Sequence, residues 1–117
     1  MGFKSYHAHV YYSGKTRKTA KEVRLGLNKL FKVRLGRWRD FPVGPHPVPM
    51  YQVAFNADQF NKIVPWLMEH HGGLSVLVHP NSGDDLMDHS AHAIWLGKQL
   101  KLKLDMFRDS ATPAKSP

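Results

Sequence analysis

The sequence predicts an α+β sandwich, and three observations lead to that class. Hydrophobic residues make up 42% of the 117 residues, which is enough for the core of one domain. Stretches in which apolar residues recur at every second position predict strands, and two longer stretches with helical spacing predict helices. Their order is strand, helix, strand, strand, helix, strand. This order is typical of the ferredoxin-like sandwich, in which an antiparallel sheet carries two helices on one face.

The first strand is predicted at residues 6–12, where the side chains alternate. Its two faces carry Tyr6, Ala8, Val10 and Tyr12 on one side, and His7, His9 and Tyr11 on the other. Because each strand residue rises about 3.3 Å, His7 and His9 are about 7 Å apart along the chain. Their rings can therefore converge on one ligand.

An amphipathic helix is predicted over residues 16–33, with its end near Gly36. A short strand is expected at residues 37–41. The next eight positions, residues 42–49, contain four prolines, a density that no helix or inner strand tolerates. This segment is therefore predicted to be a rigid loop, and residues 50–55 form the strand that follows it.

A second helix is expected to start at a cap formed by Asn56 or Asp58 and to stop at Gly72. Pro65 lies inside it and should kink or delay it. Residues 74–79 alternate and predict the last strand of the sandwich.

The C-terminal part of the chain adds a helix and a strand to this sandwich. The helix is predicted over residues 84–96, and the strand at residues 100–106. The domain is predicted to span residues 5–107, followed by a polar, disordered tail at 108–117.

The predicted topology brings distant histidines together. In a ferredoxin-like sheet the last strand lies antiparallel beside the first. The start of the first strand then neighbours the end of the last one. His7 and His9 are therefore expected to meet His79, on the sheet face away from the helices.

Composition excludes some functions and leaves others open. No cysteine is present, which excludes disulfides, thiolate metal ligands and cysteine nucleophiles. No apolar stretch has the length of a signal peptide or a membrane span, so a cytoplasmic protein without a membrane partner is expected. The net charge is +8, and ten of the 17 Lys and Arg residues fall between Lys15 and Arg39. These charges indicate either a solvated helix face, which is the commoner case, or a patch for nucleic acid or another anion.

Eight histidines are present, and their placement carries more information than their number. One histidine on a strand or loop is more often a packing residue than a ligand. Here, however, separate elements supply histidines to one region: the His7 and His9 strand, His79, and His46 in the proline-rich loop. Neutral imidazole suits Fe, Zn, Cu and Ni, and two or three histidines with open positions fit a catalytic metal.

The weaker candidates lie around the third helix and at the end of the second. His89 and His92 have helical i, i+3 spacing, whereas His70 and His71 at a helix end are given no role. A carboxylate for a facial metal site would have to come from the nearby aspartates. The Gly-Asp-Asp run is equally typical of a turn followed by a helix cap.

Three blocks of the sequence resemble the DOPA 4,5-dioxygenase family of the fungal and bacterial type. They are YHAHVYY, GRWRDFPVGPHPVPMYQVAF and VPWLMEHHGGLSVLVHPNSGDDLMDHSAHAIWLG, in the family's order. The resemblance implies an extradiol-type dioxygenase of ferredoxin-like fold, and a homodimer. Such an enzyme uses non-haem Fe(II) and O₂ to open the ring of a catechol such as DOPA.

The family motifs place histidine at His7, His9, His46, His79 and His89. On this basis His7, His9 and His79 are the expected metal ligands, and His46 and His89 the expected acid–base residues. Arg37 and Arg39 are candidates for pairing the carboxylate of a DOPA-like substrate. Fe(II) is the expected metal, although Zn or Ni could occupy an all-histidine site in the purified protein.

The sequence is also compatible with two alternative functions. The first is a non-catalytic protein that binds a small aromatic molecule or a metal. The second is a basic nucleic-acid-binding module of the same fold. Against the second, the RNA-binding version of the fold presents aromatic residues on its open sheet face, where this chain presents histidines.

Overall fold

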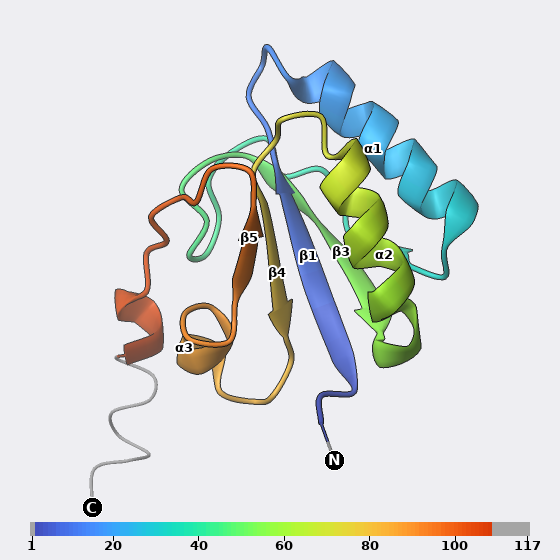
Figure 1. Cartoon of the computed structure of the whole chain (residues 1–117). Coiled ribbons are helices and arrows are strands. Elements are labelled where there is room, and N and C mark those ends of the chain that lie inside the picture. The colour runs from blue at the N-terminus through green and yellow to red at the C-terminus, as the bar shows by residue number, and fades with distance from the viewer. Residues whose placement is uncertain (1, 109–117) are drawn as a thin grey trace, which may run out of the picture.

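A computed structural model of the chain describes residues 2–108, and residues 1 and 109–117 lie outside that description. Five antiparallel strands form one sheet in the order β2-β3-β1-β4-β5 (Figure 1). The strands are β1 (Ser5–Tyr11), β2 (Arg34–Leu35), β3 (Met50–Asn56), β4 (Val76–Pro80) and β5 (Ile94–Leu96). The helices are α1 (Arg17–Leu30), α2 (Ala57–His70) and the short α3 (Asp85–Asp88).

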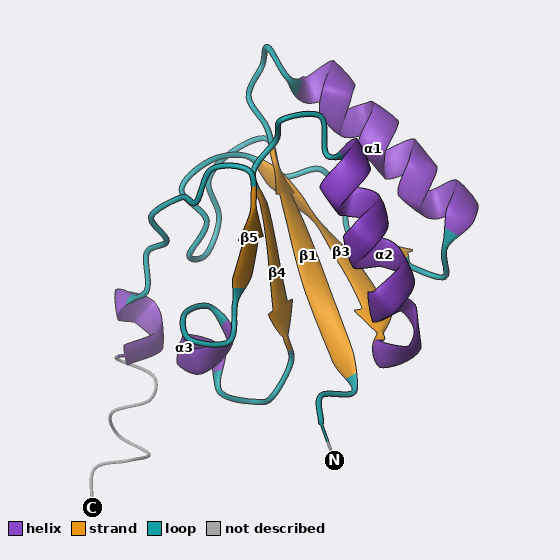
Figure 2. Ribbon diagram, viewed as in Figure 1, coloured by secondary structure: helices purple, strands orange, loops and turns teal. Residues whose placement is uncertain are grey.

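The predicted fold class is confirmed. The strands β2-β3-β1-β4, with α1 and α2 between them in sequence, make the ferredoxin-like sandwich, and β5 extends the sheet beside β4. Both long helices cover the same face of the sheet (Figure 2). None of the helices in the described part of the chain is long and apolar enough to cross a membrane.

The main core lies between the sheet and the two long helices. The helices contribute Ala20, Val23 and Leu27 from α1, and Ile63, Val64 and Leu67 from α2. The strands contribute Ala8, Val10, Tyr51, Val53, Phe55, Val76 and Val78. Burying each of the large aliphatic and aromatic side chains stabilises the fold by about 1.5–3 kcal/mol. The period-two pattern therefore assigns the odd-numbered side chains of β1, including His7 and His9, to the other face.

The helix α1 is shorter than predicted. It ends at Leu30, because Phe31 takes an extended conformation (φ −133°, ψ 162°) and packs its ring 5.8 Å from that of Trp66. The chain then forms β2 at Arg34–Leu35, so Gly36 follows a strand and does not cap the helix. The loss of the last predicted turn thus lets the chain pair with β3.

The strand predicted at residues 37–41 is wrong. Within this segment one residue, Arg39, pairs with the sheet, through an isolated bridge to Met50. The amide of Gly36 anchors the start of the segment by donating to the carbonyl of Gln52 at 2.8 Å. The proline-rich loop that follows turns back on itself, and the amide of His46 donates to the carbonyl of Val43 at 3.0 Å.

The second helix is continuous through the proline. Pro65 lies on the exposed side of α2 and does not end it, and Asn56 occupies the N-cap without a side-chain capping hydrogen bond. The two long helices approach closely at Gly26. A Cβ atom built there would lie 2.6 Å from Cζ2 of Trp66.

The C-terminal elements differ most from the prediction. Helix α3 is a single turn, and β5 pairs with β4 where the helix was expected to continue. The strand predicted at residues 100–106 is wrong, because that segment has no strand partner and becomes helical at residues 105–108. Of the tail predicted at 108–117, residue 108 belongs to this helical turn and the rest lies outside the described residues.

A smaller apolar cluster lies on the sheet face that has no long helix. It consists of Tyr11, Met50 and Leu77, covered by Val48, Ala93, Trp95, Leu100 and Leu102. The covering residues come from the proline-rich loop and from the segment that includes β5. These two segments therefore form the rim of the histidine-bearing face.

Candidate active site

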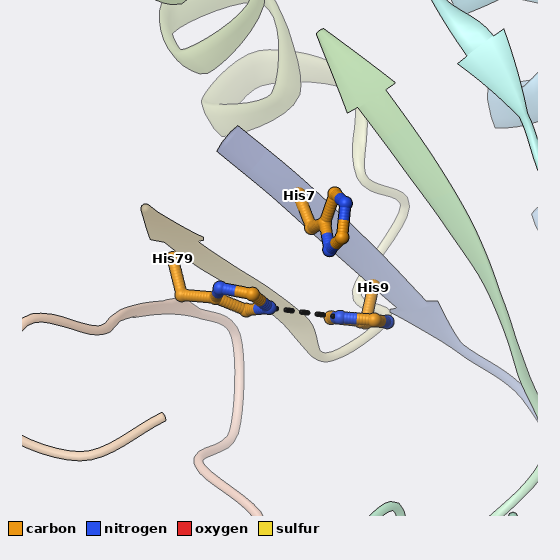
Figure 3. Close-up of side chains that lie close together, drawn as sticks. All are labelled: His7, His9 and His79. Carbon is orange, nitrogen blue, oxygen red and sulfur yellow. Dashed lines mark hydrogen bonds between the residues drawn. The ribbon is translucent and has the colours of Figure 1, made fainter. Parts of the chain in front are cut away.

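The sheet register places His7 directly opposite His79, on the adjacent strands β1 and β4. His9 follows two residues along the same face of β1. The predicted meeting of these three side chains is thus confirmed (Figure 3). One nitrogen from each of His7, His9 and His79 lies within 4.8 Å of the others, an arrangement that could hold a metal ion.

Hydrogen bonds determine the protonation of His79. Its Nδ1 lies 2.8 Å from the carbonyl oxygen of Pro80, which can only accept, so Nδ1 carries the proton. The Nε2 of the neutral ring is therefore an acceptor. It lies 3.1 Å from Nε2 of His9, which accordingly donates to it. A ring nitrogen held by a backbone carbonyl on its far side is typical of metal-ligating histidines.

His9 is as deeply buried as His79, with 3% of its surface exposed. Burial lowers the pKa of His9 well below its usual value, and the neighbouring His46, His79, His7 and His89 lower it further. The buried Nδ1 atom of His9 has no hydrogen-bond partner within the described part of the chain. This atom points away from Nε2, the nitrogen that faces His79, so an ordered water is the partner it would take.

The donor set fits a transition metal. Two imidazoles that share one ion at about 2.0–2.1 Å each have their nitrogens roughly 3 Å apart, close to the 3.1 Å between His9 and His79. Burial also lowers the pKa of His7, and the charges of His89 and Arg34 lower it further. For His79, burial lowers the pKa to about 4. All three rings are therefore neutral near pH 7, the form that binds metal.

His46 extends the cluster from the proline-rich loop. Its ring centroid lies 4.2 Å from that of His9, and its Nδ1 lies 2.7 Å from the hydroxyl of Tyr11. Burial, with the charges of His89, His79 and His7, lowers the pKa of His46 to about 4. Burial raises the pKa of Tyr11 well above its usual range, so its hydroxyl stays protonated and forms a neutral hydrogen bond with Nδ1 of His46.

His89 joins the cluster from the end of α3. Its Nδ1 donates to the carbonyl of Asp85 at 2.7 Å, which leaves Nε2 as the acceptor in the neutral ring. The ring lies between that of His79, at 4.1 Å, and that of Phe107, at 4.7 Å. Five histidines from four parts of the chain therefore gather on one face: His7, His9, His46, His79 and His89.

No carboxylate joins the three histidines among residues 2–108. Asp88 is 2% exposed and accepts hydrogen bonds from the amide and hydroxyl of Ser82, at 2.8 and 2.6 Å. Asp84 accepts from the amide of Met87 at the start of α3. The Gly-Asp-Asp run thus forms a turn and a helix cap, one of the two interpretations that the sequence allowed.

Two arginines line a cavity beside the histidines. The cavity has a volume of about 260 Å³, and its walls include His9, His46, Arg37 and Arg39. A larger cavity of about 940 Å³ is lined by His89 and by Trp95 of β5. The sequence-predicted substrate residues therefore lie at the candidate site, although the strand expected to carry them is absent.

The other three histidines lie elsewhere. His70 stacks on Trp66 and donates to its carbonyl, and His71 donates to the carbonyl of Leu74. His92 lies 3.6 Å from Asp88 and 5.4 Å, between ring centroids, from Phe3. None of them belongs to the five-histidine cluster.

The sequence reasoning missed Tyr11 and Gln52. Tyr11 shares its strand face with His7 and His9, so the alternation already placed it there, but no role was assigned to it. Gln52 faces the site because β3 pairs it with His9, and it lines the smaller cavity. Only the register between the two strands reveals that position.

These features define an α+β protein of ferredoxin-like topology with a histidine-rich site that could hold a metal ion. Residues 6–106 match the model of the Dopa 4,5-dioxygenase family, and the chain belongs to this family. The resemblance noted in the sequence is therefore confirmed, and the protein is DOPA dioxygenase-like.

Two fungal relatives are similar over most of the chain. A DOPA 4,5-dioxygenase of Amanita muscaria is 31% identical over 110 residues, which cover 86% of this chain and 48% of the relative. An uncharacterized 21.2 kDa protein of Botryotinia fuckeliana is 35% identical over 116 residues, which cover 89% of this chain and 63% of the relative. The chain thus spans less than two thirds of the length of these relatives.

A solved structure is similar over nearly its whole length. It is that of a Nostoc punctiforme protein provisionally named a dioxygenase, with 49% identity and a TM-score of 0.90. The match covers 92% of this chain and 94% of that protein. The family and these relatives together support an oxygenase.

Proposed function

We propose that the protein is a non-haem Fe(II) dioxygenase that opens the ring of a catechol, such as DOPA or a related aromatic, beside its two hydroxyls. The observation that carries the proposal is the gathering of five histidines next to a cavity with two arginines. Membership of the Dopa 4,5-dioxygenase family supports it.

His7, His9 and His79 are the proposed metal ligands. Bound Fe(II) would supply a Lewis acid that lowers the pKa of the catechol and activates O₂. The protein contributes three neutral imidazoles, of which His79 is oriented by the Pro80 carbonyl. Zn or Ni would compete for these nitrogens, because affinity alone does not favour Fe(II).

His89 and His46 are the proposed acid–base residues, with opposite roles. The Nδ1–H of His89 is held by Asp85, so its Nε2 is free to take a proton from the catechol. With the hydroxyl of Tyr11 as donor to its Nδ1, the neutral ring of His46 keeps its proton on Nε2 and can donate a hydrogen bond from there to a ligand oxygen. The ring centroids of His46 and His89 are 6.3 Å apart, so both rings can contact the same small ligand.

Arg37 and Arg39 are the proposed substrate-binding residues. Both line the cavity that also exposes His9 and His46. A guanidinium pairs well with a carboxylate through two parallel hydrogen bonds. The ring of the substrate would then lie toward the histidines, and its carboxylate toward the arginines.

The proposal also covers the oligomeric state and the cellular location of the protein. We propose a cytoplasmic homodimer that acts on a small catechol and O₂. Size-exclusion chromatography with light scattering would test the dimer, and a mass of one chain at micromolar concentration would rule it out.

The central experiment loads the protein with Fe(II) without oxygen and then follows O₂ uptake. Catechol, DOPA and caffeate are the substrates, and a yellow ring-opened product is expected. The His9→Ala variant should lose both uptake and most of its metal affinity. The His70→Ala variant removes a histidine outside the cluster and serves as the matched control.

The possible outcomes separate the functions. If the protein takes up O₂ with none of the catechols but binds the metal tightly, the enzyme proposal is refuted. The protein would then be a metal-binding protein without catalytic activity. A His9→Ala variant that binds iron as well as the wild type would refute the ligand assignment.

A further inference from the structure

The charges around the smaller cavity identify the kind of side chain that its ligand carries. We infer that, among the catechols of the proposed function, the site prefers those whose side chain ends in a carboxylate and bears no ammonium group, and that it binds DOPA more weakly. This inference rests on the proposed function, because it takes the 260 Å³ cavity as the substrate site. It separates simple catechol carboxylates from catechol amino acids.

The two cavity arginines are available to an anion. Neither Arg37 nor Arg39 pairs with a carboxylate within residues 2–108. Asp40 is their neighbour in sequence, but its Oδ1 accepts from the hydroxyl of Tyr12 at 2.7 Å and from Nε of Arg17 at 3.1 Å. The guanidinium groups at the cavity therefore lack a carboxylate counterion among the described residues, and a ligand carboxylate can supply one.

The same cavity offers no negative charge to an ammonium group. Apart from the arginines and histidines, its lining consists of Gly36, Val43, Gly44, Pro45, Met50 and Gln52. Within residues 2–108, no acidic side chain lines this cavity. An ammonium brought there would lie beside two positive side chains, and like charges brought together oppose binding.

The larger cavity does not remove this imbalance. Asp105 is the one acid among its lining residues, and Nη1 of Arg108 lies 2.9 Å from it. Lys101 and Lys103 line the same cavity. Both openings toward the histidines are therefore positively charged, in a chain whose net charge is +8.

The cavity volume limits the size of the ligand. At about 260 Å³ it lies below the roughly 300–1,000 Å³ typical of sites for drug-sized molecules. It suits a single ring with a short side chain. A carboxylate two or three bonds from the ring would reach the arginines while the hydroxyls face the histidines.

The test compares four catechols that differ in the charge of one side chain. They are 3,4-dihydroxyphenylpropionate, DOPA, 4-methylcatechol and dopamine, and their dissociation constants are measured by titration of the Fe(II)-loaded protein without O₂. The propionate should bind at least about tenfold more tightly than DOPA, and dopamine should bind most weakly. In a double variant, Arg37→Gln with Arg39→Gln, the ratio between propionate and DOPA should fall to about twofold.

Controls address folding and general charge. Both arginines are exposed, so the double variant should fold, and far-UV circular dichroism and its metal affinity verify this. Lys21→Gln removes one charge from the exposed surface of α1, on the helix-covered side, and should keep the wild-type ratio.

The results distinguish this inference from the proposed function. DOPA binding as tightly as the propionate, or a double variant that keeps the wild-type ratio, would overturn the inference. O₂ uptake with any of the four catechols decides the proposed function separately. Selective binding without uptake would uphold the charge selectivity of the site and refute the enzyme.

Discussion

The hydroxyl of Tyr11 lies 2.7 Å from Nδ1 of His46, in the interior of the protein. Tyr11 comes from β1 and shares a strand face with His7 and His9, whereas His46 comes from the proline-rich loop. The hydrogen bond therefore ties the loop to the strand that carries two of the proposed metal ligands. It also couples the protonation of Nδ1 of His46 to the orientation of the tyrosine hydroxyl.

The Tyr11→Phe variant should impair proton transfer more than metal binding. Without the hydroxyl, the buried Nδ1 of His46 loses its partner, at a cost of about 1–2 kcal/mol in the free energy of unfolding. Because the proton can then move to Nδ1, we expect kcat to fall by about tenfold while metal affinity stays within about twofold. Steady-state kinetics, metal titration and the ¹⁵N shifts of the His46 ring measure these effects.

Tyr12→Phe is the matched control for this variant. The neighbouring Tyr12 bonds Asp40 on the opposite side of the strand, so its hydroxyl affects stability and not His46. A Tyr11→Phe variant with no greater loss of kcat than Tyr12→Phe would leave Tyr11 with a structural role alone.

Metal binding should stabilise the fold through the three proposed ligands. A ligand that binds only the native state at about 100 times its dissociation constant adds about 2.7 kcal/mol to the free energy of unfolding. Zn(II) should therefore raise the thermal midpoint of the wild type and of His92→Ala. In His79→Ala the rise should be absent, since loss of a ligand weakens binding by more than about 100-fold. An equal rise in all three proteins would place the metal elsewhere.

The metal-free protein should lose stability as the pH falls from about 6.5 to 4. Burial lowers the pKa of His46 and of His79 to about 4 and that of His9 well below its usual value, whereas an unfolded histidine titrates near 6.5. Above pH 6.5 these rings are neutral in both states, so they contribute no pH dependence. Between the two values only the unfolded chain takes up their protons, which costs up to about 1.4 kcal/mol per pH unit for each ring.

Urea denaturation of the chelator-treated protein at pH 7.5, 6 and 5 measures this loss. The urea midpoint should fall across the series, and it should fall less in His46→Gln, which cannot be protonated. His70→Ala should follow the wild type, because His70 lies on the surface of α2. Midpoints independent of pH would show that the buried rings are protonated in the folded state as well.

Gly26→Ala should destabilise the protein although alanine favours helix. The substitution gains about 1 kcal/mol in helix propensity. The new methyl group would, however, lie 2.6 Å from the ring of Trp66, which packs between Phe31 and His70. Because the helices must then move apart, we expect a net loss of about 1–2 kcal/mol in the free energy of unfolding.

Chemical denaturation compares this variant with Asn28→Ala. Asn28 is exposed on the same helix, so its replacement has the gain in propensity without the clash. If Gly26→Ala proved as stable as Asn28→Ala, the close approach of the two helices would not contribute to the free energy of unfolding.

The arrangement of the five histidines could be predicted in part, because it follows from alternation and topology. Alternation placed His7 and His9 on one face, and the sandwich order placed β4 beside β1. The position of His89 could not be predicted, since it depends on where α3 ends. That end is set by tertiary contacts, in which Asp88 is buried against Ser82.

The failures of the sequence prediction have a common physical cause. Residues 100–106 alternate apolar and charged side chains, which indicates that one side is buried but not that a neighbouring strand exists. Leu100 and Leu102 do pack on the cluster of Tyr11 and Leu77, yet the amide of Lys103 bonds the carbonyl of Pro45 in a loop. A local pattern predicts which side chains are buried, whereas pairing depends on segments far away in sequence.

The proposed metal ligands and the proposed substrate-binding residues lie on different kinds of structural element. His7, His9 and His79 lie on β1 and β4, whose backbone hydrogen bonds form the centre of the sheet. Arg37, Arg39 and His46 lie on the connection between β2 and β3. This connection could be exchanged for one of another sequence without rebuilding the paired strands. In a directed-evolution experiment, a library confined to residues 37–49 should therefore yield altered ligand preference among variants that still retain the ion.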